Sequence, residues 1–374
     1  MNAQQKHIQV EISRSAFADN IHFLRQSLAP AKICVVMKAN AYGHGLEHLL
    51  DSAIGAGADY LGICTNDEAA TIRRRHPSHP ILRLRTALPD ELEESVTQLH
   101  VEEMVGSVAV AEFLAGHGRR RSSPVPVHIK IDTGMGRTGF LADDQAGMTA
   151  VCGMDGLRVR GVMTHLPSAD GTDLGSTRDQ LEQFRETMSS LESVLPKDVL
   201  VHSHNSAASM RLPELRGGMV RVGAACYGVR TSSHFSNPPE LRPVMSIKTR
   251  IMEIRDVPEG RTIGYGSLYK TTRPSRIATV PVGFGEGYPR GLFNKGIVLI
   301  NGQRCPVVGR VSLNVTTIDI TDLSGDVRWG DEVVLVGRQE SGEMTFEELA
   351  DLFGGVHTEI NLMAGFYNKP RYID

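Results

Sequence analysis

Several charged side chains of this sequence stand where apolar, strand-like segments end, and Lys38 is the first of them. It closes the run VVMK at residues 35–38 and is followed by the segment ANAYG. Lysine is a poor strand former and is rarely buried without a partner, so this amine either extends to water or serves a ligand. A lysine that is desolvated or surrounded by other cations can form a Schiff base with an aldehyde. Lys38 is therefore a candidate for covalent capture of a carbonyl compound.

Other strand-like segments end on groups with complementary chemistry. They supply Lys130 with Asp132, His165, His204 with residues 205–206, and Arg221. Arg221 keeps its charge and must face a partner, while the small residues at 222–224 leave backbone N–H groups open to a phosphate. In barrels of alternating strands and helices, phosphates commonly bind at the last such loop. A lysine that captures an aldehyde, together with a phosphate cradle, predicts pyridoxal 5'-phosphate (PLP) as the cofactor.

Each of these residues also has a structural alternative. Lys38 could extend to solvent, Lys130 could simply pair with Asp132, and His165 could be a hydrogen-bonded core histidine. His202 and His204 share one face of a strand, as in the metal-binding pairs of barrel hydrolases. No further cluster of histidines or carboxylates completes such a site, so we predict no metal.

The elements that must position these groups follow a regular order through the first two thirds of the chain. Short apolar segments bounded by turn residues alternate with helical segments, such as residues 45–57, 89–99, 108–116 and 177–195. We expect strands at 33–39, 60–64, 81–86, 101–106, 125–132, 157–165, 199–204 and 219–228. Eight strands alternating with helices predict a parallel (β/α)8 barrel, whose chemistry lies at the carboxyl ends of the strands. A helix over residues 12–28, capped by Ser13 or Ser15, should precede the first barrel strand.

The composition changes near residues 232–243, after which close-set strands follow with few helices. We expect a barrel domain over residues 1–235 and a mainly antiparallel β domain over 236–374, although the first residues could pack with the second domain. Asn301-Gly302 predicts a two-residue hairpin turn, and residues 345–354 predict a short helix.

Bulk properties exclude several classes of protein. The net charge of −3 gives no support for a nucleic-acid partner or an anionic membrane surface. No apolar run reaches the roughly 18 residues of a membrane span, and the first residues do not resemble a secretory signal. The 5 cysteines are scattered, without a CxxC motif, and we expect reduced thiols in a cytoplasmic protein.

An ordered set of motifs makes the chain resemble the alanine racemase family, which consists of PLP enzymes with a barrel and a C-terminal β domain. The motifs are VMKANAYGHG (36–45), HIKIDTGMGRTGF (128–140), GVMTHL (161–166), HNSAA (204–208), RVGAACYG (221–228), GYG (264–266), VGFGEGYPR (282–290) and VVGRVS (307–312). The resemblance covers nearly the whole chain. It implies a homodimer with active sites shared between subunits and a role in supplying D-alanine for bacterial cell walls.

The resemblance also implies a role for each matching residue. Lys38 would hold the cofactor and act as one catalytic base, and Tyr265 would be the other base, acting in the partner subunit's site. His165 would support the cofactor ring, Arg221 would face its pyridine nitrogen, and Lys130 would be open to carbamylation. The phosphate would be held by Tyr42, Ser206, Gly223, Ala224 and Tyr367. The substrate would meet Arg137, Leu313 and Tyr288, the last at the entrance.

The sequence departs from the usual family pattern at two places. Leu313-Asn314 stands where most members have Met-Asp, and Arg83 and Arg85 stand where a strand end is usually uncharged. Both features resemble broad-spectrum amino-acid racemases, so a wider substrate range with alanine as a secondary substrate is the alternative function. The two arginines could equally form structural ion pairs. A PLP carrier protein would lack the β domain with Tyr265, and a barrel-type decarboxylase would need a Cys-Asp pair that Cys305 does not match.

Overall fold

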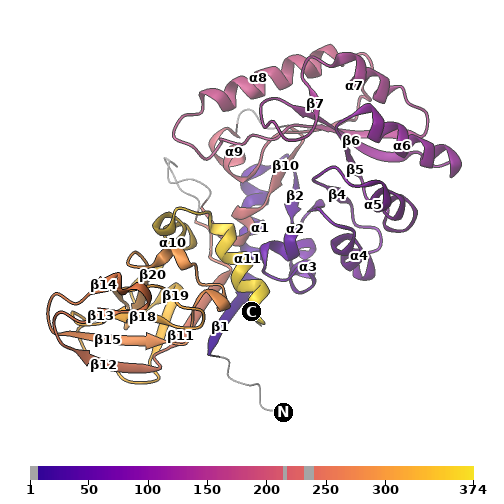
Figure 1. The fold of residues 1–374 in the computed structure, drawn as a ribbon. Helices are drawn as coiled ribbons and strands as arrows, with labels where there is room; N and C mark the ends of the chain where they lie inside the picture. Colours follow the sequence, from indigo (N-terminus) through magenta and orange to yellow (C-terminus); the bar gives the residue numbers. More distant parts are fainter. Residues whose placement is uncertain (1–6, 214–216, 231–239) are drawn as a thin grey trace. The chain divides into compact units, whose positions relative to one another are not determined.

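The computed structural model describes residues 7–213, 217–230 and 240–374 (Figure 1). The chain forms two compact units. The barrel unit comprises Phe17–Ala41 and Leu46–Leu241, and the β unit comprises Met1–Ala16, Tyr42–Gly45 and Arg242–Asp374. The expected boundary between residues 235 and 236 lies outside the described residues.

The barrel unit contains the eight expected parallel strands. They are β2 (Lys32–Val36), β3 (Tyr60–Ile63), β4 (Ile81–Arg83), β5 (Glu103–Val105), β6 (Val125–Asp132), β8 (Leu157–Met163), β9 (Leu200–His202) and β10 (Met219–Val222). Their order is β10-β2-β3-β4 in one group and β5-β6-β8-β9 in the other. A parallel bridge between Leu82 and Glu102 joins β4 to the chain entering β5, and the N–H of Arg221 donates to the carbonyl of His204 at 2.9 Å. These links close the sheet, which confirms the (β/α)8 prediction.

Helices surround these strands (Figure 1). They are α1 (Arg14–Leu28), α3 (Leu46–Gly55), α4 (Asn66–Arg75), α5 (Pro89–Glu94), α6 (Val108–Arg120), α7 (Gln145–Cys152), α8 (Gly175–Ser190) and α9 (Ser206–Arg211). Ser13 caps α1, because its Oγ accepts from the N–H of Ala16 at 3.1 Å. Most strands end earlier than expected, because the residues after them turn immediately into the loops that carry the site.

Strand β6 shows how the pleat divides apolar from polar side chains. Val127, Ile129 and Ile131 are fully buried in the apolar core shared with Phe184 of α8. Successive strand residues point to opposite faces, so the alternate residues of β6 point into the barrel. This alternation places buried polar groups, Lys130 among them, inside the barrel.

Among its described residues, the β unit contains two mainly antiparallel sheets and the α-helices α10 and α11. Its larger sheet includes β1 (Ile8–Ser13), β11 (Met245–Arg250), β16 (Ile297–Ile300), β17 (Gln303–Pro306), β19 (Glu332–Gln339), β20 (Gly342–Met344) and β21 (Arg371–Ile373). The second sheet has β12 (Glu253–Val257), β15 (Ser275–Val280) and β18 (Thr316–Asp319), and β13 (Thr262–Ile263) pairs with β14 (Tyr269–Lys270).

The two ends of the chain meet in the larger sheet. Strand β1 runs antiparallel to β11 and parallel to β21, which lies near the C-terminus. The hairpin at Asn301-Gly302 is confirmed, with φ angles of 49° and 68° between β16 and β17. The expected short helix is α10 (Phe346–Phe353), whereas α11 (His357–Tyr367) was not predicted. Among the described residues, no helix combines the length and apolar character needed to span a membrane.

Candidate active site at the barrel mouth

A left-handed turn follows the strand that leads to Lys38. The segment labelled α2 (Lys38–Tyr42) has positive φ angles of 53°, 54°, 55° and 51° at Ala39, Asn40, Ala41 and Tyr42. Left-handed helical backbone costs an L-residue about 1–2 kcal/mol, and only isolated residues adopt it routinely. The turn is closed by a hydrogen bond of 2.8 Å from the N–H of Ala41 to the carbonyl of Met37. Backbone strain of this kind is concentrated at functional sites.

Four cations gather around His165 in the barrel unit. Burial and the charges of Arg221, Arg137, Lys130 and Lys38, in that order, lower the pKa of His165 to about 3. Nη2 of Arg221 lies 3.3 Å from Nδ1 of His165, so this ring nitrogen is the acceptor. Lys38, Lys130, His165 and Arg221, which were expected to converge on one mouth, therefore lie near one another, and Arg137 joins them. His165 is neutral at physiological pH.

Arg221 is buried with 4% of its surface exposed. Its guanidinium donates to the carbonyls of Thr164 at 2.7 Å, His202 at 2.8 Å and Ser203 at 3.1 Å. Burial lowers the pKa of Arg221 to about 10, so the group remains charged at neutral pH. Because the partners are carbonyls and imidazoles, this buried cation can still be balanced by a ligand that brings negative charge.

Behind Arg221, a chain of imidazoles runs through the barrel interior. Nη1 of Arg221 donates to Nδ1 of His202 at 3.1 Å, and Nε2 of His202 lies 2.8 Å from Nδ1 of His128. Nε2 of His128 lies 2.7 Å from Glu102. Since arginine can only donate, the two histidines carry their protons on Nε2. Burial, together with the nearby charge of Arg221, lowers the pKa of His202 well below its ordinary value.

This arrangement corrects the metal-pair alternative for His202 and His204. Both ring nitrogens of His202 have protein partners, as described above. Nδ1 of His204 lies 2.7 Å from Oγ of Ser203, and its Nε2 lies 3.1 Å from the carbonyl of Leu212. The described residues contain no group of three or more potential metal ligands. The two histidines therefore organise the barrel interior.

Lys130 and Asp132 have different hydrogen-bond partners. The alternative that they simply form an ion pair with each other is therefore wrong. Nζ of Lys130 donates to the carbonyl of Ile131 at 2.7 Å. Burial, followed by the charge of Arg221, lowers the pKa of Lys130 to about 8. The carboxylate of Asp132 instead accepts four backbone N–H groups from residues 134–137, at 2.8–3.1 Å. Asp132 thus fixes the loop that carries Arg137.

Ser206 lies against the residues that follow β10, whose N–H groups were expected to be open to a phosphate. Its Oγ accepts from the N–H of Gly223 at 3.0 Å and from that of Ala225 at 3.4 Å. Asn205 caps α9 by accepting from Ala208 at 3.0 Å, and Ala224 begins the 3-10 turn η3 (Ala224–Tyr227). Ser206, Gly223 and Ala224 therefore lie together. PLP has a phosphate, an aldehyde and a ring nitrogen. The small residues around Ser206 suit the phosphate, the amine of Lys38 suits the aldehyde and Arg221 suits the ring nitrogen, so the residues present fit this cofactor.

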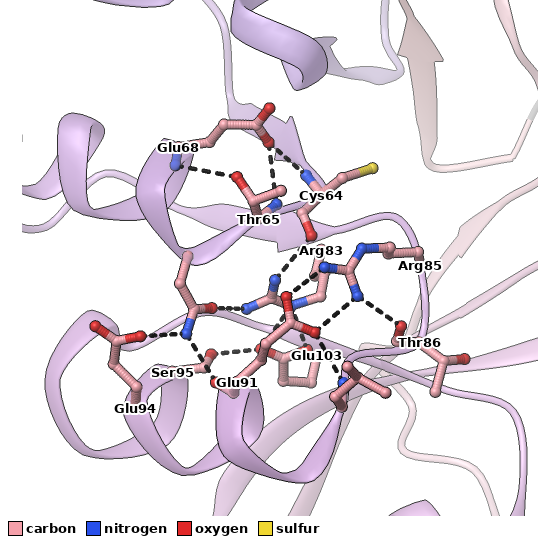
Figure 2. Close-up of polar contacts among 12 residues, drawn as sticks. Cys64, Thr65, Glu68, Arg83, Arg85, Thr86, Glu91, Glu94, Ser95 and Glu103 are labelled. Atoms are coloured by element: carbon pink, nitrogen blue, oxygen red, sulfur yellow. Dashed lines mark hydrogen bonds and ion pairs between the residues drawn. The ribbon is translucent and has the colours of Figure 1, made fainter.

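The two unusual arginines form ion pairs (Figure 2). Nε of Arg83 donates to both carboxylate oxygens of Glu103 at 2.9 and 3.1 Å, and both side chains are 0% exposed. Arg85 donates to both oxygens of Glu91, and this hydrogen bond holds the pKa of Glu91 at about 2. The structural alternative for Arg83 and Arg85 is confirmed. Arg83 has no free face for a substrate anion.

The remaining predicted residues lie in the β unit. Tyr265 is 71% exposed and lies on the turn η4 (Tyr265–Ser267), which is flanked by Gly264 at a φ of 73°. Leu313 is 55% exposed, and its carbonyl accepts from the N–H of Gly285 at 2.7 Å. Tyr367 ends α11 with an exposed side chain.

Tyr288 and Tyr42 are less accessible. Tyr288 is buried, and its hydroxyl has no hydrogen-bond partner among the described residues. Tyr42 is half-buried, and its carbonyl lies 3.1 Å from Nδ1 of His44. The roles expected for these tyrosines and for Leu313 at the barrel mouth stay predictions.

Comparisons with known proteins show the family of this chain. The alanine racemase N-terminal domain family matches residues 12–231, and the alanine racemase C-terminal domain family matches residues 244–371. The alanine racemase of Syntrophobacter fumaroxidans is 38% identical over 361 residues, which is 96% of each chain. A broad specificity amino-acid racemase of Pseudomonas taetrolens is 36% identical over 377 residues, covering 98% of this chain and 90% of the relative.

Solved structures give the same result. The alanine racemase of a D-cycloserine producing Streptomyces lavendulae has a TM-score of 0.91 at 29% identity, covering 100% of this chain and 98% of that one. An alanine racemase from Bartonella henselae with covalently bound pyridoxal phosphate has a TM-score of 0.89 at 27% identity, covering 98% and 100%. The chain therefore belongs to the alanine racemase family.

Proposed function

We propose that this protein is a PLP-dependent racemase that interconverts L- and D-alanine through two bases, Lys38 and Tyr265. The observation that carries the proposal is the cluster around His165. Lys38, which is followed by a strained turn, shares one barrel mouth with three further cations, and Ser206 meets Gly223 at neighbouring strand ends. When bound, PLP withdraws electrons from the α-carbon of the amino acid and makes its proton acidic.

The chain's own residues then have distinct tasks. Nζ of Lys38 holds the cofactor and serves as a base on one face of the α-carbon, and the hydroxyl of Tyr265 serves as the base on the other. Racemisation requires proton transfer on both faces, and two different acid–base groups supply it. Arg137, on the loop fixed by Asp132, binds the substrate carboxylate. The phosphate is held by Tyr42, Ser206, Gly223, Ala224 and Tyr367.

Arg221 controls the ring nitrogen by keeping its own protons. With a pKa of about 10 it stays charged at neutral pH and can only donate. A donor that never releases its proton leaves the pyridine nitrogen unprotonated, which weakens electron withdrawal and favours return of the proton to the α-carbon. The neutral His165 supports the ring without adding charge.

The exposure of Tyr265 supports a homodimer. Apolar side chains that lie exposed in the β unit include Leu268, Phe284, Phe293 and Leu313. Exposed apolar groups of this kind mark interaction surfaces. A second copy would cover this face and bring Tyr265 to the partner's Lys38, so that each site is complete only in the dimer. We also propose a cytoplasmic location, because all five cysteines are unpaired.

The alternative function is racemisation of a wider set of amino acids. It rests on Asn314, whose amide replaces the carboxylate usual in the family, and on the broad specificity relative from Pseudomonas taetrolens. An uncharged side chain at this position would admit substrates that are larger or more polar than alanine.

The test is α-proton exchange in deuterated buffer, read by proton NMR. The PLP-loaded protein is given L-alanine, L-serine, L-lysine and L-arginine separately. Exchange with alanine alone supports the main proposal, exchange with the whole set supports the alternative, and no exchange contradicts both. Tyr265→Phe should keep exchange for one enantiomer of alanine while losing interconversion, because one face keeps its base.

A further inference from the structure

The carboxylate of Glu68 joins two segments of the barrel unit that are distant in sequence. Its Oε1 accepts from the N–H of Ala39 at 2.5 Å, with a longer contact of 3.4 Å from that of Asn40. Its Oε2 accepts from the N–H groups of Cys64 at 2.7 Å and Thr65 at 3.1 Å. One side chain thus satisfies the loop after β3 and the left-handed turn immediately after Lys38.

Helix capping explains only half of these contacts. Glu68 is the third residue of α4 and forms a capping box with Thr65, whose Oγ1 accepts from the N–H of Glu68 at 3.3 Å. A capping box needs one carboxylate oxygen, directed at the N–H of the N-cap residue. The other oxygen is free of that task, and it is the one that reaches Ala39.

The turn that receives this oxygen depends on outside support. Three residues of the barrel unit, Ala39, Asn40 and Ala41, have left-handed backbone, and none of them is glycine. Such conformations persist only when the surroundings impose them. Hydrogen bonds to an ionised acceptor are stronger than those between neutral groups, which suits the carboxylate for this task. At the other side of the turn, Oδ1 of Asn40 accepts from the N–H of Leu46 at 2.8 Å.

The loop that precedes α4, whose N–H groups donate to Glu68, is also bound to Arg83 of β4 (Figure 2). The carbonyl of Cys64 accepts from Nη1 of Arg83 at 2.9 Å, while the N–H of the same residue donates to Glu68. Arg83 is held by its fully buried pair with Glu103. The contacts therefore continue from β5 through Arg83 and Cys64 to Glu68 and the turn.

We propose that Glu68 is a positioning residue, which holds the left-handed turn in place and thereby fixes the direction of Lys38 toward the cations around His165. The inference rests on the proposed role of Lys38 as the lysine that holds PLP. Glu68 acts through the backbone of Ala39, so its loss should loosen the turn and weaken cofactor retention without removing any group that contacts PLP.

Two variants separate this role from helix capping. In Glu68→Gln, one of the two acceptor oxygens becomes an NH2 group. The remaining oxygen should stay with the two donors Cys64 and Thr65, which leaves the N–H of Ala39 without an acceptor. Thr65→Ala removes the capping hydroxyl from α4 but keeps every contact of the Glu68 carboxylate. Glu68→Asp is a second probe, since its shorter carboxylate can serve the cap but does not reach Ala39.

The first measurement is amide hydrogen exchange on the full-length protein, with and without PLP. We expect the amides of Ala39 and Asn40 to exchange about tenfold faster in Glu68→Gln and Glu68→Asp, because a backbone group has lost its acceptor. Thr65→Ala should leave them unchanged while speeding exchange in the first turn of α4. Unchanged exchange at Ala39 in both Glu68 variants, or the same increase in Thr65→Ala, would overturn the inference.

The second measurement is the dissociation constant of PLP, together with borohydride reduction and mapping of the labelled lysine. We expect about tenfold weaker PLP binding in the Glu68 variants and wild-type binding in Thr65→Ala. If reduction of the wild-type protein does not label Lys38, the proposed function is wrong, whatever the exchange shows. If Lys38 is labelled and the Glu68 variants bind PLP normally, the positioning role alone is wrong.

Discussion

The side chains of Asn314 and Glu286 are hydrogen-bonded in the β unit, with Nδ2 of Asn314 lying 2.7 Å from Oε1 of Glu286. The other oxygen of Glu286 accepts from the N–H of Gly283 at 2.8 Å. This carboxylate therefore joins Asn314 to the turn that begins the GFGEGYPR segment. The amide at 314 is matched to a carboxylate, and an aspartate at this position would face a like charge.

Asn314→Asp should destabilise the β unit and narrow the substrate range. Replacing the amide donor by a second carboxylate leaves two negative charges in contact, and we expect a loss of about 1 kcal/mol in the free energy of unfolding near neutral pH. The rate ratio of lysine to alanine should fall. Urea unfolding and NMR exchange rates provide the two measurements. The double variant Asn314→Asp/Glu286→Gln should recover the stability, and equal rates for wild type and Asn314→Asp on every substrate would contradict the effect on specificity.

Arg83→Leu should be strongly destabilising, because it leaves Glu103 buried without its partner. Breaking a fully buried ion pair from one side costs about 3–5 kcal/mol, and this pair is 0% exposed on both sides. The double variant Arg83→Leu/Glu103→Leu removes both charges and should be more stable than the single variant. Urea unfolding at neutral pH measures both. A single variant as stable as wild type would show that the pair contributes little.

The sequence predicted the barrel because its signal is local and repeated. Each of the eight strands is a short apolar segment between turn residues, and alternation along β6 places Lys130 inside the barrel. The cation cluster was also predictable, since residues at the carboxyl ends of parallel strands must share one mouth. Hydrogen-bond partners such as those of Arg83 were left open, because ion pairing depends on which residues meet across strands.

The left-handed turn and its attachment to Glu68 were not predicted. Helical propensity and periodicity do not distinguish a left-handed turn of Ala-Asn-Ala from a strand end, so the strand was expected to continue to residue 39. No role was predicted for Glu68. Its second contact depends on a loop 29 residues earlier in the chain.

His165 should make the PLP-free protein sensitive to acid. Its pKa is about 3 in the folded state, against an ordinary value of 6.5. Between these values the unfolded chain binds a proton that the folded chain does not, so stability is lost as the pH falls from about 6.5 toward 3. The slope from one such group is at most about 1.4 kcal/mol per pH unit. His165→Asn should reduce the slope by up to this amount in urea unfolding across that range.

Some dependence of the free energy of unfolding on pH should remain in His165→Asn. The pKa of His202 is also lowered in the folded state, so His202 likewise makes the protein less stable as the pH falls. His22→Asn, on the exposed surface of α1, is the matched control. An unchanged slope in His165→Asn would mean that His165 is not held neutral by its neighbours.

We expect carbon dioxide to stabilise the folded protein by reacting with Lys130. Its pKa of about 8, against an ordinary 10.5, means that a substantial fraction of the amine is neutral at mildly alkaline pH. A neutral amine adds to carbon dioxide and releases one proton, which yields a carbamate anion beside Arg221 and Arg137. Carbamylation replaces a cation that Arg221 and Arg137 repel with an anion that they attract. Bicarbonate should therefore raise the midpoint of thermal unfolding.

The unmodified Lys130 amine also makes stability depend on pH, and this dependence does not need carbon dioxide. Below about pH 8 the folded and unfolded states are both protonated, and the repulsion at Lys130 is fully present. Stability from this group therefore rises as the pH increases from about 8 to 10.5, even without carbon dioxide. Lys130→Gln should lose both this rise and the response to bicarbonate, whereas Lys32→Gln, at the exposed start of β2, should keep both. A bicarbonate response that survives in Lys130→Gln would place the carbamate, or the effect of bicarbonate itself, elsewhere in the protein.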